Sequence, residues 1–178
     1  MAVLLGNSGT GVNSANNNAA GVAFANRFAA SANGTINLIW LRTGATGPSA
    51  GNLHGALYSD TTSGPQPVTR LSGDITGNFV ANSWVSFTVS PGLAVTSGTF
   101  YWIAWLSVGA GIDYTDFATS GGSARDSTSG LTALPTTWST SANWINVANT
   151  YGEELSLATI TFDFSQFPKS IMRTGGRI

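Results

Sequence analysis

The chain has 178 residues, of which 42% are hydrophobic, so it contains enough apolar material for one buried core. Only 8% of the residues are charged, against about 25% in a typical soluble domain, and the formal net charge is −1. The low charge argues against nucleic acid or an anionic membrane as the main partner, because binding to either requires concentrated basic charge. The lack of cysteine excludes disulfides and thiolate chemistry.

Apolar and polar residues alternate with period two between turn clusters of Gly, Asn, Ser, Thr and Pro, which predicts an all-β domain of short strands. Segment 84–89 places Val85, Phe87 and Val89 on one face, as in a half-buried strand. Segment 35–42 is partly apolar on both faces and is therefore expected to lie centrally in a sheet. The expected strands are 21–30, 35–42, 53–59, 84–89, 99–106 and 155–164.

Turn residues separate these segments. Asn33-Gly34 predicts a type I′ hairpin turn, and Pro91-Gly92 predicts another chain reversal. Long stretches without alternation predict loops, which in a compact domain are functional or mobile. These expected loops are 43–52, 109–129 and the stretch 135–143.

Three parts of the chain differ in character. Residues 1–20 are expected to form an N-terminal arm or a first edge strand, 21–164 the sandwich domain, and 165–178 a C-terminal arm. The C-terminal segment contains three basic residues, Lys169, Arg173 and Arg177, which suit anchoring to acidic groups of a partner. The alternative is that both ends are frayed tails. The start lacks the features of a secretory signal, and no apolar run is long enough for a membrane span, so we expect assembly inside a cell.

The ionisable residues give little support for catalysis. His54 is the only histidine, so a Ser-His-Asp arrangement would have to use it; an ordinary polar or interface role is the expectation. Glu153 and Glu154 are neighbours that would point to opposite faces of a strand. Asp113 and Asp116 could pair with Glu154, but an Asp in a Gly-rich turn usually caps its own backbone. We therefore expect no catalytic residue and no enzymatic activity.

Asp60 is the one candidate for a metal ligand. It precedes Thr61, Thr62 and Ser63, whose oxygens could help to hold a calcium ion. A single carboxylate provides little negative charge for binding such a cation, and a turn that ends the strand is the better interpretation. No metal and no cofactor is expected.

Six tryptophans invite a sugar-binding interpretation, because an exposed indole can stack on a sugar ring. Trp102 and Trp105 occur in a strand so apolar that core packing is expected. Trp138 and Trp144 occur among polar loop residues and suit a binding surface, with Trp84 as a weaker candidate; the alternative is that they plug one end of the sandwich. The candidate glycan-binding residues are Trp138, Trp144, Asn143, Asp113 and Asp116.

The chain reads Ala-Phe-Ala-Asn-Arg-Phe at 23–28, Gly-Thr-Ile at 34–36, Ala-Leu-Tyr-Ser-Asp at 56–60 with Gly-Pro at 64–65, and Val-Thr-Ser-Gly-Thr-Phe-Tyr-Trp-Ile-Ala at 95–104. This order of motifs resembles a family of jelly-roll domains in bacterial surface proteins and bacteriophage virion proteins. The resemblance covers residues 21–164 and implies an antiparallel β-sandwich of the jelly-roll type. Its motifs are hydrophobic and turn positions, which specify fold better than function, and it transfers no catalytic residues.

Within that group the sequence looks more like a phage virion protein than a secreted module. The first hypothesis is a non-enzymatic capsid decoration, head-fibre or tail accessory protein. It would form homo-oligomers, bind other virion proteins, and join the virion after assembly in the host cytoplasm. The alternative is a carbohydrate-binding module that attaches to surface glycans. A third, a glycan-degrading enzyme, would need paired carboxylates that the sequence does not supply.

Overall fold

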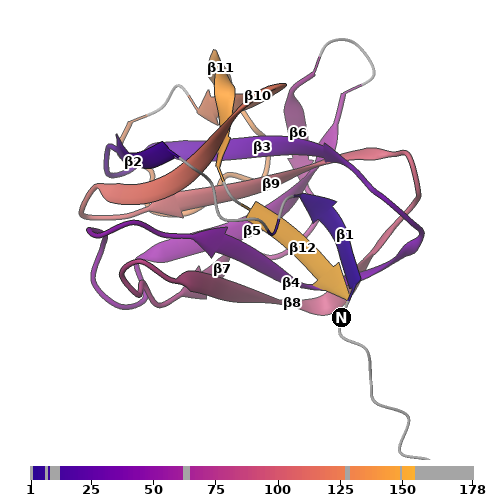
Figure 1. Ribbon diagram of the computed structural model, residues 1–178, viewed down its shortest axis with the longest axis horizontal. Helices are drawn as coiled ribbons and strands as arrows, with labels where there is room; N and C mark the ends of the chain where they lie inside the picture. Colours follow the sequence, from indigo (N-terminus) through magenta and orange to yellow (C-terminus); the bar gives the residue numbers. More distant parts are fainter. Residues whose placement is uncertain are drawn as a thin grey trace, which may run out of the picture.

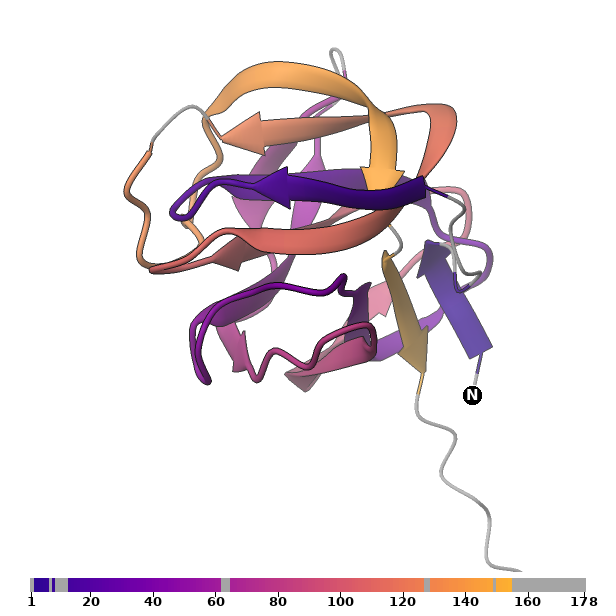
Figure 2. The same ribbon diagram turned by 60° about the vertical axis from the view of Figure 1, so that its left-hand side comes forward.

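The computed structural model describes residues 2–6, 8, 13–61, 65–126, 129–148 and 150–154. Strands and turns make up this described part of the chain, which contains no helix. Accordingly, nothing within it has the length and apolarity of a membrane-crossing helix. Two antiparallel sheets pack face to face as a β-sandwich, which confirms the predicted fold class (Figures 1 and 2). The jelly-roll type stays a prediction, and both the expected strand 155–164 and the expected arm 165–178 lie outside the described residues.

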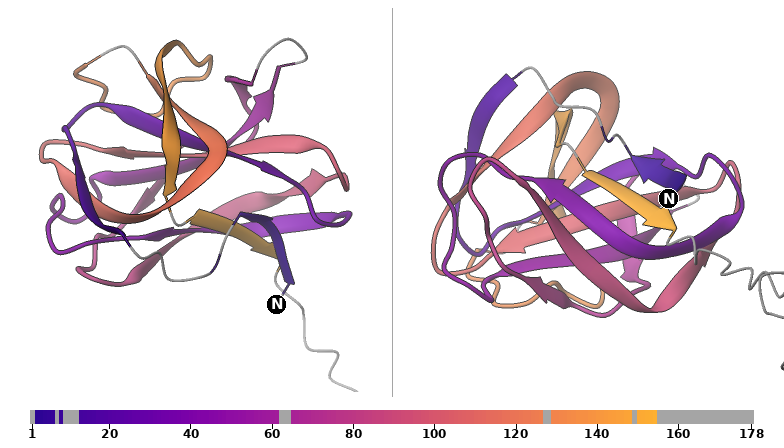
Figure 3. Two further views of the ribbon diagram at one scale, coloured as in Figure 1. Left: turned by 45° about the horizontal axis from the view of Figure 1, so that its top comes forward. Right: turned by 60° about the horizontal axis from the view of Figure 1, so that its bottom comes forward.

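The smaller sheet has four strands. Their order is β1 (Ala2–Gly6), β12 (Thr150–Glu154), β4 (Gly34–Arg42) and β8 (Trp84–Val95), and Figure 3 shows β12 between β1 and β4. β4 has a partner on both sides, so the central position predicted for segment 35–42 is confirmed. β1 lies at one edge of this sheet.

The larger sheet has eight strands. The main path runs β11 (Thr140–Ala148), β10 (Ile112–Asp126), β3 (Ala23–Ala29), β9 (Phe100–Ser107), β5 (Leu53–Asp60) and β6 (Pro67–Arg70). Two further strands join it from the side, β2 (Asn13–Asn18) on β10 and β7 (Ile75–Gly77) on β5. The strands predicted at 21–30, 53–59 and 99–106 are thus confirmed as β3, β5 and β9.

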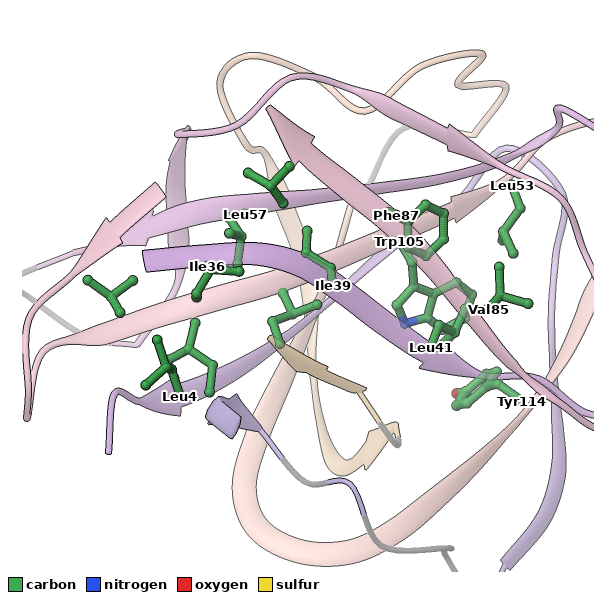
Figure 4. Close-up of a cluster of buried hydrophobic side chains, with 14 of the residues drawn as sticks. Leu4, Ile36, Ile39, Leu41, Leu53, Leu57, Val85, Phe87, Trp105 and Tyr114 are labelled. Carbon is green, nitrogen blue, oxygen red and sulfur yellow. The ribbon is translucent and has the colours of Figure 1, made fainter. Parts of the chain in front are cut away.

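The main core lies between the two sheets (Figure 4). In β8 the side chains of Val85, Phe87 and Val89 are buried and their neighbours point outward, as the alternation predicted. Trp105 on β9 enters the same core from the larger sheet and is 1% exposed. Core packing was the expectation for this tryptophan, and the burial confirms it.

The pairing of β4 with β8 contains a register shift that the sequence did not reveal. Ile36 pairs with Leu93 and Leu38 pairs with Thr88, so the register shifts between Ile36 and Leu38. Strict alternation would place Ile36 and Ile39 on opposite faces, whereas the shift brings both into the core. The extra residues lie on β8 and include Pro91-Gly92. The predicted reversal there is wrong, because β8 continues through both residues.

Two further sequence predictions are wrong. Asn33-Gly34 forms no type I′ hairpin, because β3 and β4 belong to different sheets and neither residue has the positive φ that this turn requires. The segment instead crosses between the layers, and Asn33 Oδ1 accepts a hydrogen bond of 2.8 Å from Ser97 N. The expected loop 109–129 contains the long strand β10, whose ladders with β3 and β11 override its weak strand pattern.

Candidate functional site on the outer face of the larger sheet

The side of the larger sheet that faces away from the smaller one, here called the outer face, is covered by residues 130–139, the cover segment. Four small residues of the sheet, Ala23, Ala25, Ala56 and Ala104, are buried beneath it in one cluster with Leu134. Alanine leaves room for the cover segment to lie close to the strands. The larger sheet is therefore buried on both faces over part of its area.

Backbone hydrogen bonds fix the cover segment to the edge strand β6. Trp138 N donates to Val68 O at 2.8 Å, and Arg70 N donates to Thr136 O at 2.9 Å. The guanidinium of Arg70 also donates to Leu134 O. The predicted loop 135–143 is thus a loop only as far as residue 139, since β11 begins at Thr140.

Asp74, which precedes β7, links the cover segment to His54 on β5. Asp74 Oδ2 lies 3.0 Å from His54 Nδ1, and Asp74 Oδ1 accepts a hydrogen bond of 3.2 Å from Leu134 N. His54 is only 7% exposed. The only histidine of the sequence thus helps to fasten a loop to the sheet, in line with the polar role expected for it.

The ring of Trp138 is part of this packing. It meets the ring of Tyr58 edge to face with centroids 5.2 Å apart, and the residue is 7% exposed. The Tyr58 hydroxyl donates a hydrogen bond to Pro135 O, which fastens the cover segment to β5 beside this pair of rings. In this arrangement Trp138 presents no open ring face on which a sugar could stack.

A charged cluster lies on the same outer face. Arg27 on β3 donates from Nε and Nη2 to Asp60 Oδ2 on β5, at 3.0 and 2.6 Å. Trp102 on β9 donates from Nε1 to Asp60 Oδ1 at 2.8 Å. The guanidinium carbon of Arg27 lies 3.7 Å from the ring centroid of Phe100. Three neighbouring strands thus bring an ion pair and an aromatic ring together.

Burial differs across this cluster. The side chains of Arg27 and Asp60 are 24% and 10% exposed, whereas Phe100 is 40% exposed. Because Arg27 already neutralises the Asp60 carboxylate, a cation at this point would have to displace the guanidinium. The described part of the chain also holds no group of three His, Asp or Glu residues suited to a metal ion.

Asp113 also fastens a loop. It lies near the start of β10, and its Oδ2 accepts hydrogen bonds from Thr46 Oγ1 at 2.7 Å and from Thr46 N at 3.2 Å. Gly44 N donates to Asp113 O at 2.7 Å. These bonds attach the loop 43–52, which was expected from the sequence, to the larger sheet.

The remaining candidates for glycan binding are spread along β10. The backbone of Asp116 pairs with Asn13 and Ala148 near the start of the strand. Asn143 and Trp144 on β11 pair with Ala124 and Ser123 near its end. The backbone pairing therefore does not bring the two acids together with the two candidates from β11.

The predicted partner-anchoring residues, Lys169, Arg173 and Arg177, lie outside the described residues. Sequence reasoning did not select Arg27 or Phe100. A signal was present, because Arg27 interrupts the otherwise apolar outward positions of a strand in a chain with few charges. What the sequence lacked was the pairing that sets Arg27 opposite Trp102 and Phe100 opposite Ala29.

Comparisons with known proteins add no relative: no family model matches the chain, and neither the curated proteins nor the solved structures contain a match.

Proposed function

We propose that the protein is a non-enzymatic structural protein of a bacteriophage virion, such as a capsid decoration, head-fibre or tail accessory protein. The observation that carries the non-enzymatic part is the use of the ionisable side chains as internal fasteners. Asp74 and Asp113 attach loops to the larger sheet, and Arg70 attaches the cover segment. A catalytic group must face its substrate at hydrogen-bonding distance, whereas these groups face their own chain.

The virion part of the proposal is supported by the sequence resemblance and by the low charge of the chain. A sandwich whose loops are held by internal hydrogen bonds suits a protein that displays a fixed surface on a particle. The partners would be other virion proteins and further copies of the chain. In this proposal Lys169, Arg173 and Arg177 contact acidic groups of the partner.

Co-sedimentation with candidate phage particles tests the proposal. The full chain is compared with a version ending at Phe164, and light scattering gives the oligomeric state of both. The full chain is expected to pellet with the particles, and the shortened chain to remain in the supernatant with an unchanged unfolding curve. A third variant in which Lys169, Arg173 and Arg177 are replaced by Gln separates the loss of charge from the loss of length. Equal pelleting of all three would contradict the anchoring role, and pelleting of none would contradict the virion assignment.

The geometry does not favour a carbohydrate-binding module built on Trp138. Its ring packs on Tyr58, and only 7% of the residue is exposed. If glycan binding exists, another surface should carry it.

A further inference from the structure

We propose that Arg27, Asp60 and Phe100 form a binding site for an uncharged sugar ring. The inference does not depend on the virion assignment, because it rests on the geometry of the charged cluster alone. It also differs from the glycan surface expected around Trp138, since it uses other residues of the outer face.

Phe100 supplies an exposed aromatic ring, of which the Arg27 guanidinium covers one face. Val3, Leu71, Val80 and Phe100 are the large hydrophobic residues exposed in the described part of the chain, and Phe100 is the only aromatic one among them. Its pairing partner on β3 is Ala29, which is small and exposed, so space remains beside the ring. The apolar C–H face of a pyranose can pack against the part of the ring that the guanidinium leaves exposed, and its hydroxyls can then approach the edge of the stacked guanidinium.

The ion pair supplies fixed hydrogen-bonding groups next to that ring. Arg27 donates hydrogen bonds from Nε and Nη2 to Asp60, and its Nη1 has no hydrogen-bond partner among the described residues. Asp60 Oδ1 accepts from Trp102 and keeps further lone-pair capacity. Adjacent hydroxyls of a sugar both donate and accept, so they match an arginine N–H beside a carboxylate oxygen. The planar fork of Arg27 is held on both Asp60 and Phe100, so little side-chain entropy remains to be lost on binding.

Charge balance selects an uncharged ligand. Arg27 and Asp60 cancel each other, and so the cluster offers no net attraction for an anion or a cation. The pair is also a weak explanation of stability, since the desolvation of a largely buried ion pair offsets most of its Coulomb attraction. In a chain with 8% charged residues, a binding role explains better why two of them meet beside an exposed ring.

Nuclear magnetic resonance on the full, ¹⁵N-labelled chain tests the site directly. The Arg27 Nε–H and Trp102 Nε1–H signals report on two of the three hydrogen bonds to Asp60. The probes are methyl glucoside, methyl galactoside and N-acetylglucosamine, with glucuronic acid as the charged comparison. At least one uncharged probe is expected to shift both signals saturably, with a dissociation constant on the order of 1 mM.

Two variants and a matched control locate the binding. Phe100→Ala should weaken it at least tenfold, and Arg27→Lys should also weaken it because lysine keeps the charge but loses the planar fork. Val80→Ala removes a comparably exposed apolar side chain and should bind as the wild type does. The proposal is overturned if no uncharged probe shifts either signal, if glucuronic acid binds more tightly, or if the Phe100 and Val80 variants behave alike. Phe100→Ala should still pellet with particles, so the site and the virion assignment fail separately.

Discussion

Replacement of Trp138 by alanine distinguishes a packing role of this residue from a binding role. A tryptophan side chain buries about 150–250 Å². At about 25 cal/mol per Å², its loss removes about 4–6 kcal/mol of burial energy, which is an upper value. Since the cover segment lies at the surface and can settle onto the alanines below it, we expect a loss of about 3 kcal/mol in the free energy of unfolding. The melting temperature should then fall by about 6–12 °C.

Urea unfolding and calorimetry measure this loss, and Trp138→Phe is the matched variant. Trp138 Nε1 is buried without a hydrogen-bond partner among the described residues, so phenylalanine keeps the packing and breaks no hydrogen bond. We expect this variant to cost only about 1 kcal/mol. An unfolding free energy of Trp138→Ala within about 0.5 kcal/mol of the wild type would refute the packing role and return Trp138 to the candidates for a binding surface.

Two further stability predictions follow from the contacts. Gly55→Ala should destabilise the protein by about 1–3 kcal/mol in urea unfolding, because the new methyl group would lie 2.7 Å from the ring of Phe87; Gly73→Ala, with no atom within 4 Å, should stay within about 0.5 kcal/mol, and equal effects would contradict the packing at Gly55. Asp74→Asn should accelerate hydrogen exchange at the Leu134 amide, because the charged acceptor of that N–H is lost. An unchanged exchange rate would contradict a role of Asp74 and show that the backbone hydrogen bonds are sufficient to hold the cover segment.

The sequence predicted the strands whose side chains alternate clearly and missed those that depend on their neighbours. β8 was found because Val85, Phe87 and Val89 repeat at period two. β10 includes Thr119, Ser120, Gly121 and Gly122, which carry no such signal, and its ladders with other strands define it. A ladder between segments far apart in the chain leaves no local trace, so β10 was predicted to be a loop.

The same limit explains the candidate residues. Trp138 was assigned to a surface because its sequence neighbours are polar, and this local signal does not reveal the alanines that lie under the cover segment. Ala25, Ala56 and Ala104 come from three strands and become one patch only through the register of β3, β9 and β5. Arg27 and Asp60 were both visible in the sequence, and only this register brings them together.

Trp102 connects the core to the proposed sugar site. Its ring belongs to the outer-face cluster and is 2% exposed, while its Nε1 holds Asp60 at 2.8 Å. Asp60 in turn fixes the guanidinium of Arg27, so the position of this guanidinium depends on the packing beneath it. A site supported in this way keeps its geometry without a ligand, because its residues lie on paired strands and their side chains are locked by a second layer of contacts. Loosening the cover segment should therefore weaken sugar binding even though no residue of that segment belongs to the site.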